Sequence, residues 1–314
     1  MLKCKARLRD YVEYNPDWGR RGQRKESPSA WQPLSTTEMV YGINPVLSAL
    51  EAQRRSIRRV YVQEGLEDGK NREVVARIRA LAAAAGVPVL AAGKHELNLL
   101  TRDASHQGVT MSCSALSCVH LDRMSAALPF FASEKAPSSS GVWVALDQVM
   151  DPQNFGAALR SAAFLGAAGV LTCSRNSSPL SAAVSKASAG VLERASVHSC
   201  SSLPSFLRGA GEDGWLVLGA AQGGGAVGVD GLAARWRGEA GEKAPAARPP
   251  IVLVMGNEGA GLRTLVKQAC SHLVEVPLAG PAEAFAQSPS LNVSATLAVL
   301  LHVLGSTFSC RDDC

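Results

Sequence analysis

The stretch LDQVMDPQNFGAALRSAAF, residues 146–164, is the part of the chain from which the fold can be built. It follows the apolar run GVWVA, which predicts a short strand, and we interpret Asn154 as the N-cap of the next helix. After it, apolar side chains recur at the spacing of one buried helix face: Phe155, Ala158, Leu159, Ala162 and Ala163. Arg160 lies off that stripe, one turn beyond Gly156. An amide and a guanidinium at the carboxyl end of a strand stand where open α/β sheets bind ligands, although a capped surface helix with a solvated arginine has the same pattern.

The length and composition of the chain are typical of a two-domain protein. Its 314 residues are 46% hydrophobic, and no apolar run is long enough to span a bilayer, so we expect no membrane association. The net charge of +5 favours polyanionic partners. Residues 1–60 hold twelve Lys and Arg against six acidic residues, a balance that fits a nucleic-acid footprint, a targeting segment or a plain solvated surface.

The eight cysteines argue against a structural metal. None forms a CxxC pair, and no histidine stands at zinc-finger spacing from two cysteines. Cys173 and Cys270 lie in apolar segments, as small core residues do. We therefore expect a reducing compartment and no metal.

Patterning along the chain predicts two domains with a linker between them. Residues 1–38 lack periodicity and are rich in charge, Pro and Ser, so we interpret them as a basic, poorly ordered arm or a targeting segment. Residues 39–120 predict a small α/β domain, with helices at 43–52, 72–85 and 94–100 and strands at 58–63, 87–92 and 106–116. The remaining predicted boundaries are a linker at 121–141, a second domain at 142–308 and a tail at 309–314.

The second domain alternates strands and helices, which predicts a mainly parallel sheet with helices on both faces. Its predicted strands are 142–146, 169–173, 195–198, 215–219, 251–255 and 273–276. Its later predicted helices are 181–190, 203–209, 262–270 and 290–304. The stretch 223–250 is rich in Gly, Ala and Arg, and we interpret it as a surface insertion.

Two loops of this domain carry candidate chemistry. GNEGAGL, at 256–262, follows a fully apolar strand, and its glycines let backbone N–H groups approach a ligand. It is neither a P-loop nor a dinucleotide fingerprint, and a tight structural turn has the same composition. Glu258 in its middle has little packing purpose, which favours a functional carboxylate. In the Ser-rich segment 175–190, Lys186 is either a phosphate contact or part of an ordinary capped helix.

The segment SLNVSATLAVLLHVL, at 290–304, predicts a helix that is apolar nearly all round. It starts with a Ser–Leu–Asn cap. A helix of this kind needs burial on every side, so we expect it to lie either in the core or against a second subunit.

Three motifs of the second domain resemble those of the SpoU/TrmH family of RNA 2′-O-ribose methyltransferases, in the SPOUT superfamily. They are DPQNFGAALRSAAFLG, then VMGNEGAGL, then VPLAG followed by SLNVSATLAVLL, in the family's order. YGINPVLSAL and HQGVTM are similar to the first domain of its ribosomal RNA guanosine methyltransferase branch, which includes mitochondrial members. The resemblance implies a deep trefoil knot in the C-terminal domain, a ribosomal-protein-like domain that holds RNA, a homodimer, and S-adenosylmethionine as the methyl donor.

The resemblance also implies roles for individual residues. Matches to the family's catalytic residues are Asn154, Arg160, Glu258, Ser290 and Asn292. Matches to positions whose backbone holds the cofactor are Gly256, Val276 and Leu291. Since a guanidinium is effectively never deprotonated, we expect Arg160 to hold a phosphate and stabilise the developing alkoxide while another group acts as base. We expect Asn154 and Glu258 to order Arg160, and Ser290 and Asn292 to cap the last helix.

These implications add up to S-adenosylmethionine-dependent 2′-O-methylation of a ribose, of guanosine, in large-subunit ribosomal RNA of the mitochondrial ribosome. The alternatives are a transfer RNA 2′-O-methyltransferase and a catalytically idle RNA-binding assembly factor on the same fold. The mitochondrion is the expected compartment, with plastid or bacterial cytoplasm as alternatives. Two stretches, 281–289 and 223–250, depart from the family's pattern. RNA contacts are expected from basic residues of the first domain: Arg54, Arg55, Arg58 and Arg59.

Overall fold

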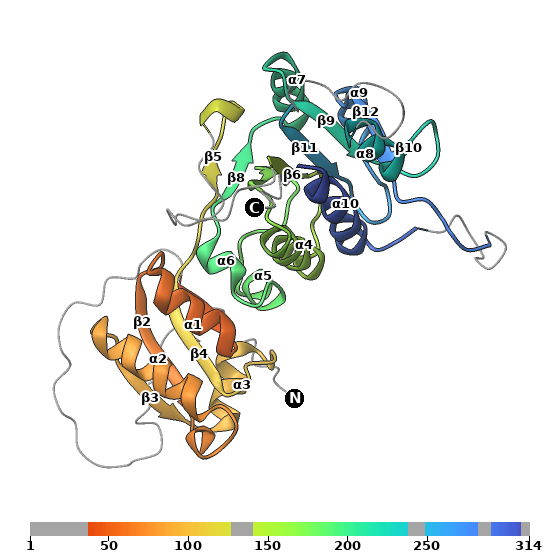
Figure 1. Ribbon diagram of the computed structural model, residues 1–314. Helices are drawn as coiled ribbons and strands as arrows, with labels where there is room; N and C mark the ends of the chain where they lie inside the picture. Colours follow the sequence, from red (N-terminus) through yellow and green to blue (C-terminus); the bar gives the residue numbers. More distant parts are fainter. Residues whose placement is uncertain (1–36, 127–140, 238–248, 282–289, 309–314) are drawn as a thin grey trace, which may run out of the picture.

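The computed structural model describes residues 37–126, 141–237, 249–281 and 290–308. These residues form two α/β domains, a smaller N-terminal one and a larger C-terminal one (Figure 1). The predicted tail at 309–314 and almost all of the predicted arm lie outside the described residues.

The N-terminal domain is a four-stranded sheet packed against helices. The strand order is β1–β4–β2–β3, with β4 antiparallel to both neighbours and β3 parallel to β2. Its strands are β1 (Thr37–Tyr41), β2 (Ile57–Gln63), β3 (Val89–Ala92) and β4 (Val109–Ser114). Its helices are α1 (Ile43–Ala52), α2 (Arg72–Ala84) and α3 (Lys94–Thr101). The three predicted helices are confirmed within one residue at each end, because the periodic apolar stripes of α1 and α2 do enter one core.

The C-terminal domain is an eight-stranded sheet in which every pairing is parallel, in the order β10–β12–β9–β11–β6–β7–β8–β5. Its strands are β5 (Val119–His120), β6 (Val142–Leu146), β7 (Gly169–Cys173), β8 (Val197–Cys200), β9 (Leu216–Ala220), β10 (Val227–Gly228), β11 (Ile251–Met255) and β12 (His272–Glu275). Its helices are α4 (Pro152–Phe164), α5 (Ala182–Ala187), α6 (Val191–Arg194), α7 (Leu203–Glu212), α8 (Val229–Arg237), α9 (Thr264–Gln268) and α10 (Val293–Phe308).

Two apolar cores lie on opposite faces of this sheet. Every residue of β6, β7 and β11 is buried, and successive side chains of each strand alternate between the two cores. Helices α4, α8 and α10 cover one face, whereas α7 and α9 cover the other. The predicted α/β fold with a parallel sheet and helices on both faces is confirmed, and the deep trefoil knot stays a prediction.

Two predicted boundaries are wrong because short strands lack a periodic signal. β1 begins at Thr37, two residues inside the predicted arm, and its Glu38 pairs with Arg55. The predicted linker also starts too late, since β5, Leu121 and Met124 already belong to the sheet and core of the C-terminal domain. Residues 127–140 of that linker lie outside the described residues.

The predicted surface insertion at 223–250 is wrong over its first half. That part holds β10 and α8, and Val229, Leu232 and Ala233 of α8 are buried. The predicted helix at 181–190 is too long, because α5 ends at Ala187 and the positive φ angles of Ala189 (+53°) and Gly190 (+87°) separate it from α6. A side chain at Gly190 would meet Ser48 of the N-terminal domain, so the break lets α1 come close.

Candidate functional site

Three segments that are far apart in the sequence meet beyond the carboxyl ends of β6, β11 and β12. The Nδ2 atom of Asn154 donates to Glu258 Oε2 at 2.7 Å. The Nδ2 atom of Asn292 donates to Asn154 Oδ1 at 2.9 Å and to Glu258 Oε1 at 3.1 Å. One predicted polar residue from each motif thus enters a single network, which we call the polar triad (Asn154, Glu258 and Asn292).

The prediction that Asn154 caps its helix is wrong, and for this reason its side chain is available to the triad. Asp151 is the N-cap, and its carboxylate accepts the backbone N–H of Asn154 at 3.0 Å. Pro152 follows at the first helical position, where its missing N–H costs nothing. The Asn154 side chain lies in the first turn of α4 and is free to bind across to the other motifs.

Asn292 does act as the cap that the sequence predicts. α10 begins at the next residue, and the Asn292 Oδ1 atom accepts the N–H of Ser294 at 2.9 Å. Its amide nitrogen is then directed to the triad. Among the described residues Ser290 makes no capping bond, and it lies instead in the wall of a nearby cavity.

The GNEGAGL loop is held in shape by its own asparagine. The Asn257 side chain accepts the N–H groups of Gly259 and Ala260 at 3.0 and 3.2 Å, and donates to the carbonyl of Gln148 at 3.0 Å. The backbone of Asn257 also pairs with Gly261 across the loop. Asn257 therefore ties the glycine loop to the turn after β6, a role that the sequence did not predict.

A buried carboxylate anchors the same loop from below. Asp147, directly after β6, is fully buried and accepts the Arg263 Nε at 2.7 Å and the Arg263 backbone N–H at 3.1 Å. Arg263 stands at the start of α9, at the end of the glycine loop. The pair fixes where the loop leaves the sheet, and sequence reasoning had no signal for it because the partners are 116 residues apart.

A cavity of about 580 Å³ opens beside the triad, within the usual size range of small-ligand sites. The three predicted cofactor positions, Gly256, Val276 and Leu291, line it together with two predicted catalytic residues, Glu258 and Ser290. A Cβ on Gly256 would lie 2.4–2.6 Å from backbone atoms of Gly261 and Leu262, so only glycine lets the loop close there. Backbone groups with apolar neighbours fit an adenine and ribose better than they fit a metal.

Arg160 is the predicted catalytic residue that the structure does not join to the others. It is exposed on α4, and within the described part of the chain its guanidinium has no hydrogen bond or ion pair. Asn154 and Glu258 bind each other and Asn292, so the expectation that they order Arg160 is wrong for this structure. Gly156, one turn before Arg160, faces α5, and a Cβ there would lie 2.5 Å from Ala187, so the close packing of α4 on α5 requires glycine.

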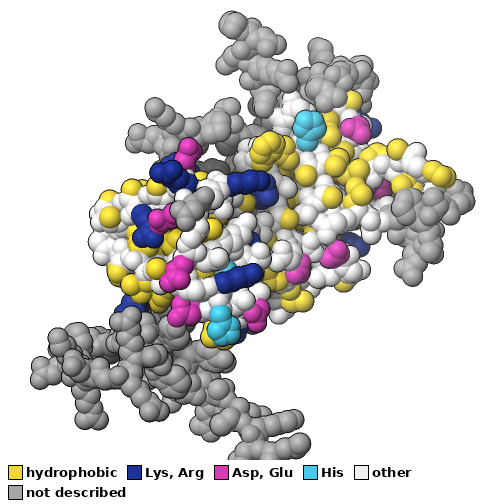
Figure 2. Space-filling view, turned by 90° about the horizontal axis from the view of Figure 1, so that it is seen from below, with side chains coloured by type: hydrophobic (Ala, Val, Ile, Leu, Met, Phe, Trp, Pro, Cys, Tyr) yellow, Lys and Arg dark blue, Asp and Glu magenta, His cyan; other side chains and the backbone are white. Residues whose placement is uncertain are grey.

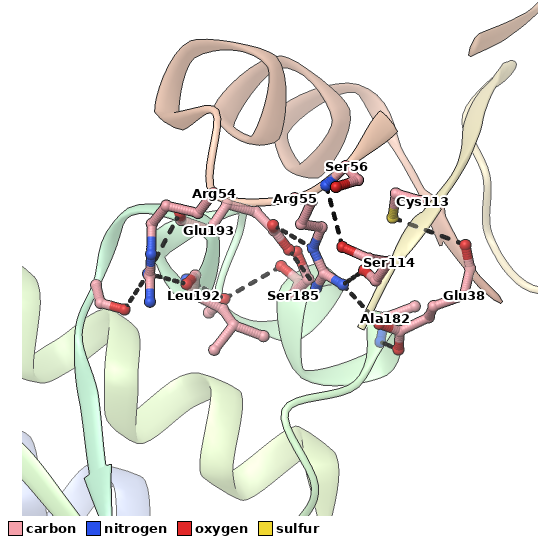
Figure 3. A network of polar contacts seen from close by, with 12 residues as sticks. Glu38, Arg54, Arg55, Ser56, Cys113, Ser114, Ala182, Ser185, Leu192 and Glu193 are labelled. Atoms are coloured by element: carbon pink, nitrogen blue, oxygen red, sulfur yellow. Dashed lines mark hydrogen bonds and ion pairs between the residues drawn. The ribbon is translucent and has the colours of Figure 1, made fainter. Parts of the chain in front are cut away.

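Two of the four arginines expected to contact RNA are engaged between the domains. Arg55 is 5% exposed and pairs with the buried Glu193 of α6 (Figure 3). Arg54 donates to the Leu192 carbonyl at 3.4 Å. The expectation for Arg55 is wrong, because its burial depends on a partner 138 residues away. Arg54 is exposed, and its contact with RNA stays a prediction. Arg59 is exposed and Arg58 is half-buried in β2.

Lys186 also contacts the N-terminal domain, since its Nζ donates to Gln107 Oε1 at 2.7 Å. Burial lowers the pKa of Lys186. Seen from below the view of Figure 1, Lys and Arg side chains are interspersed with Asp and Glu side chains rather than gathered in a patch of one sign (Figure 2). In the described ranges no group of three His, Cys, Asp or Glu side chains could hold a metal, and no helix is long and apolar enough to cross a membrane.

Comparison with known proteins gives these features a family. Residues 141–302 match the model of the SpoU rRNA methylase family, and residues 39–118 match the model named RNA 2′-O ribose methyltransferase substrate binding. The chain belongs to the SpoU family. It is therefore an RNA methyltransferase, an enzyme, and its N-terminal domain is the substrate-binding domain.

Two relatives cover most of this SpoU-family chain. It is 35% identical to human rRNA methyltransferase 1, mitochondrial, over 87% of this chain and 74% of the human protein. It is 34% identical to an uncharacterized tRNA/rRNA methyltransferase of Mycobacterium ulcerans, over 93% of this chain and 84% of that protein. Both matches extend across the two domains.

Solved SpoU-type structures share the fold. An rRNA methyltransferase from Sinorhizobium meliloti superposes with a TM-score of 0.60 at 23% identity, covering 85% of this chain and 86% of that one. The SpoU methyltransferase AviRb from Streptomyces viridochromogenes, solved with AdoMet, gives a TM-score of 0.60 at 20% identity, covering 86% and 90%.

Proposed function

We propose that this SpoU-family enzyme transfers a methyl group from S-adenosylmethionine to the ribose 2′-hydroxyl of a guanosine in large-subunit ribosomal RNA of the mitochondrial ribosome. The observation that carries the proposal is the polar triad, which brings Asn154, Glu258 and Asn292 together beside a glycine-lined cavity. The human relative is named a mitochondrial rRNA methyltransferase, and this supports both the RNA class and the compartment.

The cavity supports S-adenosylmethionine as the cofactor. Gly256, Val276 and Leu291 present backbone and apolar atoms to one space of suitable volume. Related structures from Sinorhizobium meliloti and Streptomyces viridochromogenes were solved with AdoMet. When bound, the cofactor would supply an electrophilic methyl group on a sulfonium.

The residues of the chain would then align the substrate and stabilise charge. Arg160, which remains protonated, would hold a phosphate next to the reacting ribose through two parallel hydrogen bonds and stabilise the oxyanion that forms at the 2′-oxygen. The triad would hold the first turn of α4 and the glycine loop in fixed positions, with Ser290 in the cavity wall. The hydroxyl proton would leave to another acceptor, a phosphate oxygen or water.

A homodimer belongs to the same proposal. Phe164 at the end of α4 is 88% exposed, and Val299 of α10 is 39% exposed, although α4 and α10 pack together. Exposed apolar side chains on a helix pair favour a partner surface over water. Of the two places expected for the last helix, the core buries Leu297 and Leu301, and the exposed Val299 favours a second subunit for the other side.

The proposal is tested with purified protein, tritiated S-adenosylmethionine and two RNA pools. We expect label in large-subunit ribosomal RNA, released by nuclease digestion as 2′-O-methylguanosine. Label in transfer RNA alone would favour the transfer RNA alternative, which the name of the mycobacterial relative also allows. Binding of RNA without any label would favour the idle assembly factor and overturn the proposal.

A further inference from the structure

A buried ion-pair network that the reaction does not use joins the two domains. The side chains of Arg55, between α1 and β2, and Glu193 of α6 are both fully buried. Nε and Nη2 of Arg55 donate to the two carboxylate oxygens of Glu193 at 2.6 and 2.9 Å. Nη1 of the same guanidinium donates to Glu38 at 2.7 Å. Arg55, Glu193 and Glu38, shown in Figure 3, form what we call the interdomain joint.

Further contacts tie the joint to the backbone on both sides. The second oxygen of Glu38 accepts the N–H of Ala182 at 2.5 Å, at the start of α5. Arg54 donates to carbonyls at the end of α6, including those of Leu192 and Ala195. Every partner in the C-terminal domain therefore lies in or directly after α5 and α6.

These two helices connect the joint to the helix that bears Arg160. Gly190 between them lies so close to α1 that a Cβ would be 2.6 Å from Ser48 Oγ. On the other side, α5 packs on α4 at Gly156, where a Cβ would be 2.5 Å from Ala187. In Figure 1, α5 and α6 accordingly lie between the substrate-binding domain and α4.

We propose that the interdomain joint determines which nucleotide is methylated, because it holds the substrate-binding domain at a fixed distance and angle from Arg160. The inference rests on the proposed function. A bidentate pair buried away from water has one good geometry, since any displacement leaves a charge without its partner. Burial alone would lower the pKa of Arg55, but the hydrogen bonds and charge of Glu193 outweigh it and raise the pKa, so the guanidinium stays charged.

The test replaces the carboxylate of the joint in the full chain with Glu193→Gln. Its matched control is Glu67→Gln, which removes a carboxylate from the exposed pair with Arg79, away from the joint. Large-subunit RNA transcripts are methylated with labelled cofactor, and the modified positions are mapped. We expect Glu193→Gln to lower kcat/KM on the structured RNA at least tenfold and to spread methylation onto neighbouring nucleotides, with cofactor affinity within twofold of the unchanged protein.

We expect Glu67→Gln to behave as the unchanged protein. A Glu193→Gln enzyme that methylates the same single position with kcat/KM within twofold would overturn the inference. If Glu193→Gln does not fold, Glu38→Ala takes its place, because Glu38 is the partly exposed carboxylate of the joint and its loss removes the bonds to Arg55 and to the Ala182 N–H. The same results are expected and the same results would overturn the inference.

Small-angle scattering of the RNA-free protein separates this inference from the proposed function. We expect the radius of gyration of Glu193→Gln to exceed that of the control, because the domains separate. If the unchanged chain methylates no RNA, the proposed function fails, and the scattering still decides whether the joint holds the domains. Equal radii of gyration for the two variants would show that the joint does not hold the domains, whatever the methylation assay gives.

Discussion

The polar triad and the interdomain joint are two networks of the same kind in opposite surroundings. Each includes bonds between residues more than 100 positions apart, with carboxylates among the acceptors. Glu258 and Asn292 of the triad are exposed, whereas the Arg55 and Glu193 side chains of the joint are fully buried. Water can replace the bonds of the first network but not those of the second. The exposed network is thus suited to meet a ligand, and the buried one to fix geometry.

The largest effect is expected at Arg160, on the exposed side of this comparison. Arg160→Ala removes a side chain with no partner among the described residues, so the melting temperature should not change. Loss of a group that stabilises the oxyanion should lower methyl transfer by roughly a hundredfold to a thousandfold. Cofactor affinity, measured by calorimetry, should stay within a few-fold. Near-normal turnover would show that Arg160 has no catalytic role.

The buried side of the comparison predicts a loss of stability instead. Arg55→Ala leaves Glu193 buried and charged without a partner, which should lower the free energy of unfolding by about 3–5 kcal/mol. Arg79→Ala, which breaks the exposed pair with Glu67, should cost less than about 1 kcal/mol. Urea titrations of both variants measure the difference. Equal losses would mean that the joint contributes no more than a surface pair.

A smaller effect is expected for Glu258→Gln within the triad. The amide keeps the shape of the carboxylate but offers one acceptor oxygen to the two Nδ2 donors of Asn154 and Asn292. Losing one hydrogen bond to a charged group should lower kcat about tenfold, with an unchanged melting temperature. A variant that melts earlier but turns over normally would place Glu258 among the structural residues.

The smallest effect concerns pH and a buried histidine of the substrate-binding domain. His106 accepts the N–H of Gly108 on Nδ1 at 3.0 Å, while Nε2 lies 2.9 Å from Asn98 Oδ1. Only the neutral imidazole can accept a hydrogen bond on one nitrogen and donate from the other. Burial first, then the charges of Lys94 and Lys186, lower its pKa below 6.5. The unfolded chain therefore takes up the proton first, and stability should fall as the pH drops below about 6.5.

His106→Asn is the matched variant for this pH dependence. The side-chain oxygen of an Asn at position 106 can accept the N–H of Gly108, and an Asn side chain does not titrate. Unfolding titrations between pH 7.5 and 5, roughly the range in which histidine changes charge, should show a shallower decline for the variant. His198, whose pKa burial also lowers, should contribute to the decline that remains. Identical slopes would exclude His106 as a contributor.

The sequence predicted the long periodic elements because their burial is local. The apolar stripe of α4 and the fully apolar β11 entered the core as expected. The helix α8 was missed although Val229, Leu232, Ala233 and Trp236 have helical spacing, because the Gly- and Ala-rich composition around them suggested a surface insertion. Strands as short as β5 offer no pattern to find.

The candidate site was predictable as a set of residues and not as a set of contacts. The order of the three motifs indicated which side chains would meet, and Asn154, Glu258 and Asn292 do meet. The cap by Asp151 has a local signal that the interpretation overlooked, since Pro152 follows it at the first helical position. The sequence could not show that Arg55 is neutralised by Glu193, 138 residues away, nor that Asn257 donates to Gln148, 109 residues away. Such pairings depend on how distant segments pack, and no spacing in the chain encodes them.

The central claim, that the glycine loop forms a cofactor cavity, is tested most directly by calorimetric titration of S-adenosylmethionine into the full chain and two variants. Gly256→Ala places a methyl group 2.4–2.6 Å from backbone atoms of Gly261 and Leu262, whereas Gly259→Ala meets only Asn257 Oδ1 at 3.7 Å. We predict binding by the unchanged chain and by Gly259→Ala, and at least a roughly hundredfold weaker affinity for Gly256→Ala, which is about 2.7 kcal/mol. No heat with the unchanged chain, or equal affinity for all three proteins, would contradict the account.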